Sequence, residues 1–180
     1  GEAEYQFPIR GDYEVAVTAV VDWLQNCKEV DIQRIGLWGV SLGGYYVTRA
    51  VAFEKRIKAC IGLSGPYDFS DNWKELPLLT REAFRVRSHL ASEQEAYEHS
   101  QTLTLKKGVS SQIECPLFLV TGKQDRIVPW QDTERLAKEV SGPVEMLLVE
   151  DGNHIANNRP YRYRLKTADW MAKQLGLPLV

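Results

Sequence analysis

The pentapeptide GVSLG at positions 39–43 has the spacing G-x-S-x-G, in which a serine can serve as a nucleophile. A short β-branched run precedes it and a stretch with helical spacing follows, so Ser41 is predicted to occupy a tight strand-to-helix turn. Glycine on either side allows close approach of the backbone. Such a turn exposes the Ser41 hydroxyl at a helix N-terminus, where developing negative charge is stabilised. It also makes the backbone N–H of Leu42 a candidate oxyanion-hole donor.

A serine hydroxyl is a weak nucleophile without a base, and the chain has three histidines. His89 and His99 lie among charged residues in a helical region, where exposure to solvent is sufficient to explain them. His154 lies in the turn-forming sequence Asp-Gly-Asn-His, directly after the last predicted strand. Because the carboxyl ends of parallel strands meet at one edge of a sheet, His154 is predicted to reach Ser41 and act as the general base.

The base needs a carboxylate that fixes its tautomer, and Asp125 is the candidate. It lies in the sequence TGKQDRIVP (121–129), which begins with the end of the preceding strand. Two other aspartates compete with it. Asp132 is interpreted as a first-turn residue of a helix, and Asp151 is so close to His154 in sequence that local turn geometry explains it. The order serine, aspartate, histidine is one of the known orders of hydrolytic triads.

The elements that must position these residues follow from the apolar pattern. Four short apolar runs without strict alternation indicate strands of a parallel sheet covered on both faces. Stretches with helical spacing alternate with them, which predicts an α/β fold with a doubly wound sheet. The expected strands are 32–40, 57–65, 116–122 and 144–150, and the expected helices are 11–27, 41–53, 130–140 and 160–175.

About fifty residues separate the second expected strand from the third, which is too long for a simple crossover. Residues 68–110 are therefore interpreted as a helical insert, with helices after Thr80 and Ser92, that shapes a pocket over the sheet edge. The candidate substrate-binding residues are Val40, Tyr67 and Trp73. Aromatic side chains here are compatible with an aromatic substrate, and core packing explains them equally well.

The composition limits the class of protein. The 180 residues are 44% hydrophobic and 26% charged, which is typical of a globular domain. A net charge of −2 without a basic run argues against a nucleic-acid partner, and no apolar run approaches the roughly 18 residues of a membrane span. Three widely spaced cysteines indicate neither a disulfide framework nor a cysteine-ligated zinc site, and they are typical of a reducing, cytoplasmic compartment.

Taken together, these motifs resemble the α/β-hydrolases, in particular the group that contains 2,6-dihydropseudooxynicotine hydrolase, the fermentation-respiration switch esterases and the fungal polyketide-shortening hydrolases. The resemblance implies an α/β-hydrolase fold, with Ser41 as nucleophile, Asp125 as triad acid and His154 as base. It also implies hydrolysis without a metal or organic cofactor, and it is compatible with a homodimer. The segments that carry it are DYEVAVTAVVDWL, GVSLGGYY, RIKACIGLSGPYDFSDNW, IECPLFLVTGKQDRIVP and DGNHIANN.

Hydrolases of this fold begin with further strands, and a loop after one of them supplies another oxyanion donor. Gly1 and Glu2 resemble the end of the loop that leads into the helix at 11–27. In the family's strand order the strand at 32–40 has neighbours on both sides, so four strands alone leave Ile35 and Leu37 on an unpaired apolar edge. We therefore expect residues 1–180 to be the C-terminal part of a catalytic domain, completed by an N-terminal segment of the same protein or by another chain.

The function predicted from the sequence is that of a serine hydrolase. Its substrate is expected to be a small, aromatic ester, or a ketone cleaved at a C–C bond, and the reaction to pass through an acyl-enzyme. Two alternatives remain: a serine peptidase of the prolyl-oligopeptidase type, and a binding protein that keeps the scaffold without turnover. The presence of serine, aspartate and histidine in the expected loops favours an enzyme.

Overall fold

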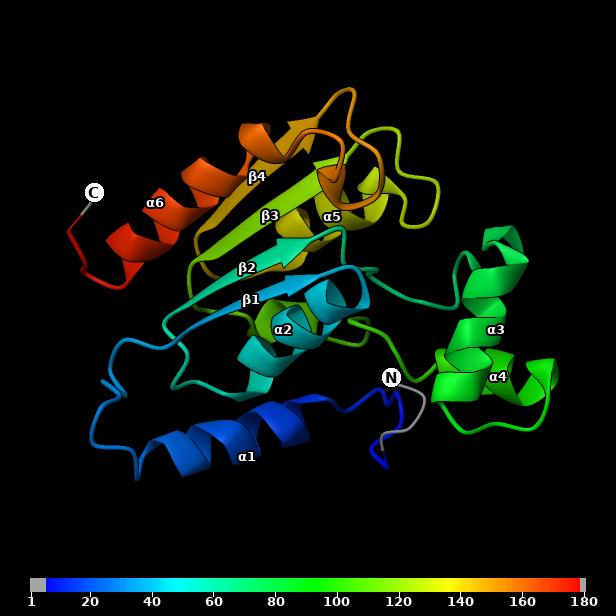
Figure 1. Ribbon diagram of the computed structural model, residues 1–180, viewed down its shortest axis with the longest axis horizontal. Coiled ribbons are helices and arrows are strands. Elements are labelled where there is room, and N and C mark those ends of the chain that lie inside the picture. The colour runs from blue at the N-terminus through cyan, green and yellow to red at the C-terminus, as the bar shows by residue number, and fades with distance from the viewer. Residues whose placement is uncertain (1–5, 179–180) are drawn as a thin grey trace.

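The computed structural model describes residues 6–178, so the loop expected at Gly1 and Glu2 lies outside the described residues. Four parallel strands form one sheet whose spatial order is the order of the sequence (Figure 1). All four lie within their predicted ranges, so the expected parallel sheet is confirmed. The strands are β1 (Gly36–Val40), β2 (Ala59–Leu63), β3 (Leu117–Gly122) and β4 (Val144–Val149).

Helices cover both faces of the sheet, as the continuous apolar strands require. One face packs against three helices and the other against the last helix of the chain. In Figure 1 that last helix lies on the opposite side of the sheet from α2. The helices of these two layers are α1 (Glu14–Leu24), α2 (Leu42–Phe53), α5 (Trp130–Glu139) and α6 (Arg164–Gln174).

The two middle strands form the centre of the core. Every residue of β2 and β3 is buried. Cys60 and Leu119 face α2 and α5, while Ile61 and Phe118 face the other way, toward Trp170 of α6. Because alternate residues of a strand point to opposite faces, both sets must be apolar, and the alternating pattern of a half-exposed strand is absent here.

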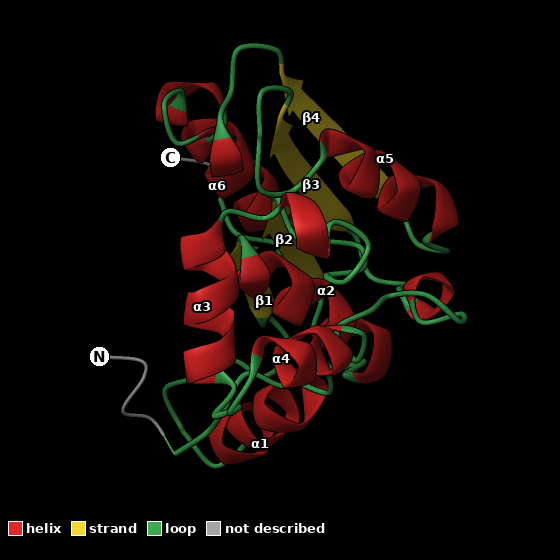
Figure 2. Cartoon of the chain, turned by 90° about the vertical axis from the view of Figure 1, so that its right-hand side faces the viewer, coloured by secondary structure: helices red, strands yellow, loops and turns green. Residues whose placement is uncertain are grey.

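The connection from β2 to β3 contains the two helices expected there, α3 (Leu78–Arg87) and α4 (Glu93–Ser100). The Ser92 hydroxyl accepts a hydrogen bond from the backbone N–H of Glu95, at 3.2 Å, which caps α4 as predicted. Helix α3 begins two residues before Thr80. Figures 1 and 2 show both helices beyond the carboxyl ends of the strands, at the end of the sheet where the turn at Ser41 lies.

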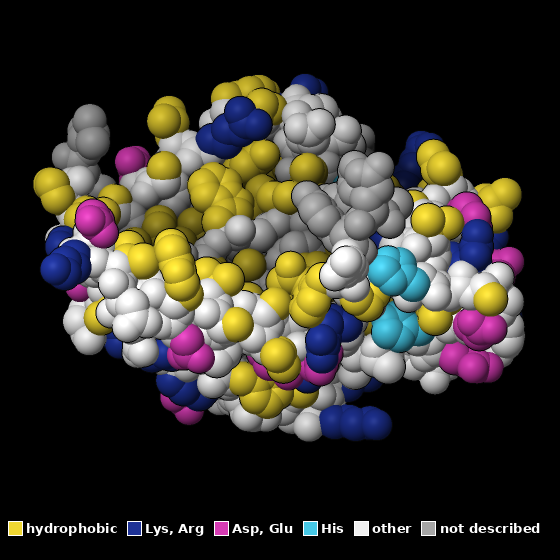
Figure 3. Space-filling model, turned by 60° about the horizontal axis from the view of Figure 1, so that its bottom comes forward, with side chains coloured by type: hydrophobic (Ala, Val, Ile, Leu, Met, Phe, Trp, Pro, Cys, Tyr) yellow, Lys and Arg dark blue, Asp and Glu magenta, His cyan; other side chains and the backbone are white. Residues whose placement is uncertain are grey.

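Strand β1 forms one edge of the sheet and pairs with β2 alone among the described residues. The side chains of Trp38 and Val40 are 47% and 44% exposed. A groove of about 250 Å³ runs between this edge and α1, and hydrophobic side chains gather on this face (Figure 3). Its apolar lining includes Val20, Ile35 and Leu37. Within residues 6–178 no helix combines the length and the apolar character needed to cross a bilayer.

We expect the 180-residue chain by itself to associate as its concentration rises, because an exposed apolar strand edge pairs readily with another chain. Trp38→Lys introduces a charge at this edge and should shift the chain toward monomer. Leu165→Lys is the matched control, since Leu165 is 77% exposed on α6 rather than on the edge strand. Light scattering after size-exclusion chromatography measures the mass. A monomer at every concentration would contradict the expectation.

Candidate active site

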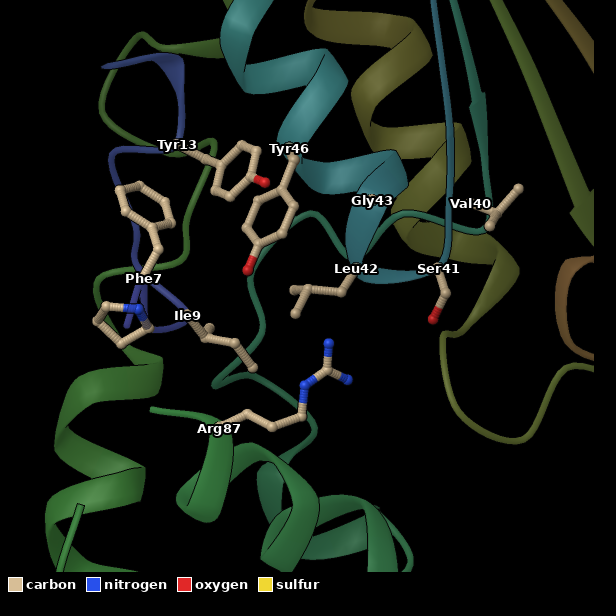
Figure 4. Close-up of a pocket in the computed structure, with 10 residues that line it drawn as sticks. Phe7, Ile9, Tyr13, Val40, Ser41, Leu42, Gly43, Tyr46 and Arg87 are labelled. Atoms are coloured by element: carbon tan, nitrogen blue, oxygen red, sulfur yellow. The ribbon is translucent and has the colours of Figure 1, made fainter. Parts of the chain in front are cut away.

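Ser41 occupies a strained turn between β1 and α2. Its backbone has φ 55° and ψ −127°, a conformation that residues other than glycine adopt at an energetic cost. The N–H of Ser41 donates to the carbonyl of Leu63 at the end of β2, at 2.8 Å, which holds the turn in place. The predicted strand-to-helix turn is therefore present, and it directs the hydroxyl away from the end of the sheet (Figure 4).

Two glycines make this turn sterically possible. A Cβ atom on Gly39 would lie 2.0 Å from the carbonyl oxygen of Gly43, and one on Gly44 would lie 2.9 Å from the Cα of Gly65. A Cβ on Gly43 itself would meet no atom within 4 Å. The close approach expected on both sides of Ser41 is thus made by Gly39 and Gly44, whereas Gly43 borders open space.

The structure brings Ser41, His154 and Asp125 into one hydrogen-bonded chain. The Nε2 atom of His154 lies 2.8 Å from the Oγ of Ser41, and its Nδ1 atom lies 2.8 Å from an Oδ of Asp125. Because an ionised carboxylate only accepts hydrogen bonds, Nδ1 carries the proton and Nε2 is left to accept from the serine hydroxyl. The Asp125 side chain is fully buried and that of His154 is 23% exposed.

The surroundings of Asp125 keep its carboxyl ionised. Burial acts to raise its pKa, but hydrogen bonds from His154 and from the backbone N–H groups of Val128 and Ile127 outweigh it and hold the pKa below the usual value. The two backbone donors lie 3.0 and 2.9 Å from one carboxylate oxygen. The other oxygen remains available to His154.

The loop that carries His154 is fixed by two neighbouring strand ends. The N–H of Ile155 donates to the Oγ of Ser64, which follows β2, at 3.1 Å. The N–H of Gln124, after β3, donates to the carbonyl of Gly152 at 2.9 Å. Ile155 has φ 54°, so its strained backbone depends on these contacts. The role of Ser64 is not predicted from the sequence, because a serine in a turn after a strand has no signal that separates it from other serines.

The alternative candidates for the acid and the base, which are Asp132, Asp151 and His99, contact other groups. Asp132 lies in the first turn of α5, as interpreted from the sequence, and accepts a hydrogen bond from the N–H of Tyr67 at 3.0 Å. Asp151 pairs with Arg159 at 2.7 Å. The Nε2 of His99 lies 2.8 Å from the backbone carbonyl oxygen of Ile9, so this ring nitrogen contacts the backbone and not Ser41.

A pocket of about 540 Å³ opens beside Ser41 (Figure 4). One wall is made by the parallel rings of Tyr13 and Tyr46, whose centroids lie 3.7 Å apart. The end of α3 contributes Arg87, whose guanidinium group points into the pocket in Figure 4. The described lining residues are Phe7, Pro8, Ile9, Tyr13, Val40, Ser41, Leu42, Gly43, Tyr46 and Arg87.

Of the three expected substrate-binding residues, Val40 lines this pocket, and Tyr67 and Trp73 do not. The Tyr67 hydroxyl donates to Glu139, and the guanidinium of Arg135 lies 4.0 Å from its ring centroid, so the side chain packs against α5. Trp73 is buried within the insert, where it packs against aromatic side chains of that insert. The positions of Tyr67 and Trp73 therefore fit core packing, which was the second explanation of these aromatic side chains from the sequence.

Tyr13, Tyr46 and Arg87 line the pocket opposite Val40 and are not among the site residues predicted from the sequence. A weak signal existed, because Tyr46 follows Ser41 by five residues, which places it little more than one helical turn beyond the predicted turn.

A parallel sheet with a strained serine turn, and with histidine and aspartate loops at the same edge, is the architecture of an α/β-hydrolase. The sequence profile described as the prolyl oligopeptidase family matches residues 11–178. The chain belongs to this family of α/β-hydrolases.

Characterised relatives are hydrolases. The 2,6-dihydropseudooxynicotine hydrolase of Paenarthrobacter nicotinovorans is 36% identical over 164 residues, which cover 91% of this chain and 44% of the relative. The 20-hydroxy-prefusarin hydrolase of Gibberella moniliformis is 28% identical over 153 residues, covering 65% of this chain and 36% of the relative. The resemblance stated from the sequence motifs is thereby confirmed. The chain spans about half the length of the curated relatives it matches.

Solved structures of hydrolases share the fold of this chain. The crystal structure of 2,6-dihydroxy-pseudo-oxynicotine hydrolase superposes with a TM-score of 0.87 at 34% identity, covering 96% of this chain and 49% of the other. Est1E from Butyrivibrio proteoclasticus superposes with a TM-score of 0.70 at 19% identity, covering 91% and 69% of the two chains. The second comparison shows a shared fold alone.

We expect Gly39→Ala to lower the free energy of unfolding by about 3 kcal/mol or more, because its Cβ would collide with a backbone oxygen that cannot move without shifting α2. Gly43→Ala is the matched control and should change that free energy by less than about 1 kcal/mol. Denaturant unfolding of both variants measures the difference. Equal effects would contradict the assignment of the steric constraint to Gly39.

We expect Asp132→Asn to stabilise the protein at pH 7.5, where the half-buried carboxyl is ionised at a cost. Burial raises the pKa of Asp132 to about 6, and the N–H of Tyr67 offsets this only in part. The folded state therefore binds a proton more tightly than the unfolded state, and the penalty grows as the pH rises from about 4 to about 6. The gain should be on the order of 2 kcal/mol at pH 7.5 and should shrink toward pH 4.

Urea unfolding at pH 4.5 and 7.5 measures this gain. Asp151→Asn is the control, since the side chain of Asp151 is 49% exposed and pairs with Arg159, which lowers the pKa of its carboxyl. A gain from Asp132→Asn that is the same at both pH values would contradict the assignment of the penalty to ionisation.

Proposed function

We propose that this protein is a serine hydrolase of small carbonyl compounds, with Ser41 as nucleophile, His154 as general base and Asp125 as the residue that orients the imidazole. The observation that supports this most directly is the unbroken hydrogen-bonded chain from Ser41 through His154 to Asp125. Geometry of this kind raises the nucleophilicity of a serine hydroxyl at neutral pH.

In the proposed mechanism, Nε2 of His154 accepts the Ser41 proton as Oγ attacks the substrate carbonyl. The resulting oxyanion is stabilised by the N–H of Leu42, which starts α2 and has no carbonyl from an earlier helical turn to bind. The imidazolium then protonates the leaving group, and an acyl-enzyme remains on Ser41. Water activated by His154 hydrolyses it and regenerates the free hydroxyl.

The substrate is proposed to be a small aromatic ester, or an aromatic ketone cleaved at the C–C bond next to its carbonyl. Two observations support this class. The pocket beside Ser41 has stacked tyrosine rings on one wall and a volume of about 540 Å³, suited to a molecule of one or two rings. The similarity to 2,6-dihydropseudooxynicotine hydrolase points the same way.

We also propose that the open edge of β1 pairs with a further strand, supplied by an N-terminal segment of the same protein. The exposed side chains of Trp38 and Val40 and the apolar groove beside α1 support this, since natural sheets cover such edges. A loop from that segment would also be in reach of Ser41, which directly follows β1, and would supply a second oxyanion donor.

A peptidase is the second candidate, because the matching family is that of prolyl oligopeptidase. The two activities can be distinguished by the substrates that the protein cleaves. A small-carbonyl hydrolase cleaves 4-nitrophenyl acetate and leaves glycyl-prolyl 4-nitroanilide intact, whereas a prolyl peptidase cleaves the anilide. The third candidate, a binding protein on the same scaffold, cleaves neither.

We expect a fluorophosphonate probe to label the full-length protein once per chain and to fail on Ser41→Ala. Ser111→Ala is the matched control and should label normally, because its hydroxyl only donates to the carbonyl of Gly108 on the exposed surface. Asp125→Asn should lower kcat by about 10⁴-fold, since the amide favours the wrong imidazole tautomer. Intact-protein mass spectrometry and steady-state kinetics measure these effects. A wild type that does not label would exclude a serine nucleophile.

A further inference from the structure

A short segment, residues 8–11, lies between two cavities. One is the pocket of about 540 Å³ beside Ser41. The other is a cavity of about 510 Å³ whose lining includes Ser88 and His99, at the ends of α3 and α4. Pro8 and Ile9 line both cavities. This segment, the partition, therefore divides one space from the other.

Both backbone polar groups of Ile9 are held by the helical insert. Its N–H donates to the carbonyl of Arg87 at 3.1 Å. Its carbonyl oxygen lies 2.8 Å from the Nε2 of His99, and because a carbonyl only accepts, Nε2 carries the proton and donates it. The His99 ring packs against the ring of Phe84, with centroids 5.9 Å apart, which fixes the direction of the imidazole. Two hydrogen bonds to the insert therefore set how far Ile9 enters the pocket.

The other end of the partition is held by α2 and by the residues after α4. The buried Tyr45 hydroxyl donates to the carbonyl of Gly11 at 2.7 Å. A Cβ atom on Gly11 would lie 2.2 Å from the carbonyl oxygen of Thr102, so the two backbones are in direct contact. Because α2 begins next to Ser41, the partition has a fixed position relative to the reacting hydroxyl.

The side chain of Ile9 is the part of the partition that enters the substrate pocket (Figure 4). The residue is 8% exposed, so it is packed in place on its other sides. An apolar side chain at this position offers no polar contact to a ligand. It closes the pocket by its volume, which limits the length of a substrate rather than selecting a functional group.

We propose that Ile9 is a specificity-determining residue that limits substrate length, and that His99 is the positioning residue that holds Ile9 in place. The preferred substrates are then small carbonyl compounds without a further substituent that extends toward residues 8–11. This inference rests on the proposed hydrolase function, because it takes the pocket beside Ser41 as the substrate site.

The test of Ile9 uses two pairs of esters that differ by one propyl group. In 4-nitrophenyl 4-propylbenzoate and 4-nitrophenyl benzoate the propyl group extends the acyl group, and in 4-propylphenyl acetate and phenyl acetate it extends the leaving group. The ratio of kcat/KM for the longer to the shorter ester is compared between variants of the full-length protein, so the intrinsic reactivity of the esters cancels.

Ile9→Ala should raise at least one of these ratios by roughly 10-fold or more, because it opens space for several methylene groups. Ile9→Val should raise the same ratio by less, and it removes less core volume in case the alanine variant does not fold. Ratios that stay at the wild-type value in the folded variants would overturn the proposal.

The role of His99 is tested through Ile9. His99→Leu should raise the same ratio, and His99→Gln should restore most of the wild-type value, because a glutamine amide can donate to the Ile9 carbonyl. The double variant of Ile9→Ala and His99→Leu should give a ratio within about twofold of Ile9→Ala alone, since His99 acts through Ile9. Independent effects that multiply would overturn the positioning role.

Two matched controls separate this effect from general loosening. Ile57→Ala truncates an isoleucine that is 2% exposed and lies just before β2, at the other end of the sheet from Ser41. His89→Asn replaces an exposed histidine with φ 60°, a conformation that asparagine tolerates. Both variants should keep the wild-type ratios. A rise in either control as large as that in Ile9→Ala would overturn the proposal.

A binding measurement separates this proposal from the hydrolase function. Benzamide and 4-propylbenzamide are titrated into Ser41→Ala protein by calorimetry, and Ile9→Ala should raise the affinity for the longer amide relative to the shorter by roughly 10-fold. Fluorophosphonate labelling is scored separately. Failed labelling with an Ile9-dependent preference would reject the hydrolase and keep the length limit. Normal labelling without any Ile9 effect on the ratios or the affinities would do the reverse.

Discussion

The turn at Ser41 depends on the close contact between the start of α2 and the end of β2. Gly44 meets the backbone at Gly65 with no room for a side chain, and the N–H of Ser41 bonds to the carbonyl of Leu63. These contacts fix the direction of α2. They also fix everything that α2 carries toward the pocket: the N–H of Leu42 at its first residue and the ring of Tyr46 one turn later.

A parallel sheet turns this local constraint into a site. Ser41, Asp125 and His154 follow β1, β3 and β4, and the two hydrogen bonds that join them link residues 113 and 29 positions apart. The buried middle strands β2 and β3 support the backbone that carries these side chains, because they keep the strand ends in register while the loops above carry strained residues such as Ile155.

Much of this could be predicted from the sequence, because the signals were local or periodic. The glycine spacing identified the turn at Ser41, continuous apolar runs identified buried parallel strands, and the position of His154 after the last strand placed it at the same edge. What could not be predicted depends on tertiary packing. Tyr67 follows a strand end just as a pocket residue would, yet its hydroxyl bonds to Glu139 on α5, and nothing in the surrounding sequence indicates that direction. Arg87 cannot be recognised as a pocket residue from the sequence, because only the fold places the end of α3 beside Ile9.

The helical insert and the hydrogen-bonded chain from Ser41 to Asp125 are supported separately. The three side chains of that chain come from strand-end loops outside residues 68–110, and the His154 loop is held by Ser64 and Gln124 rather than by α3 or α4. The insert adds Arg87 to the pocket without forming any hydrogen bond in the chain from Ser41 to Asp125. Substitutions, insertions or deletions in these helices can therefore reshape the pocket while the hydrogen-bonded chain stays intact. The architecture is modular, because the part that shapes the pocket and the part that orders the polar residues are held by different contacts.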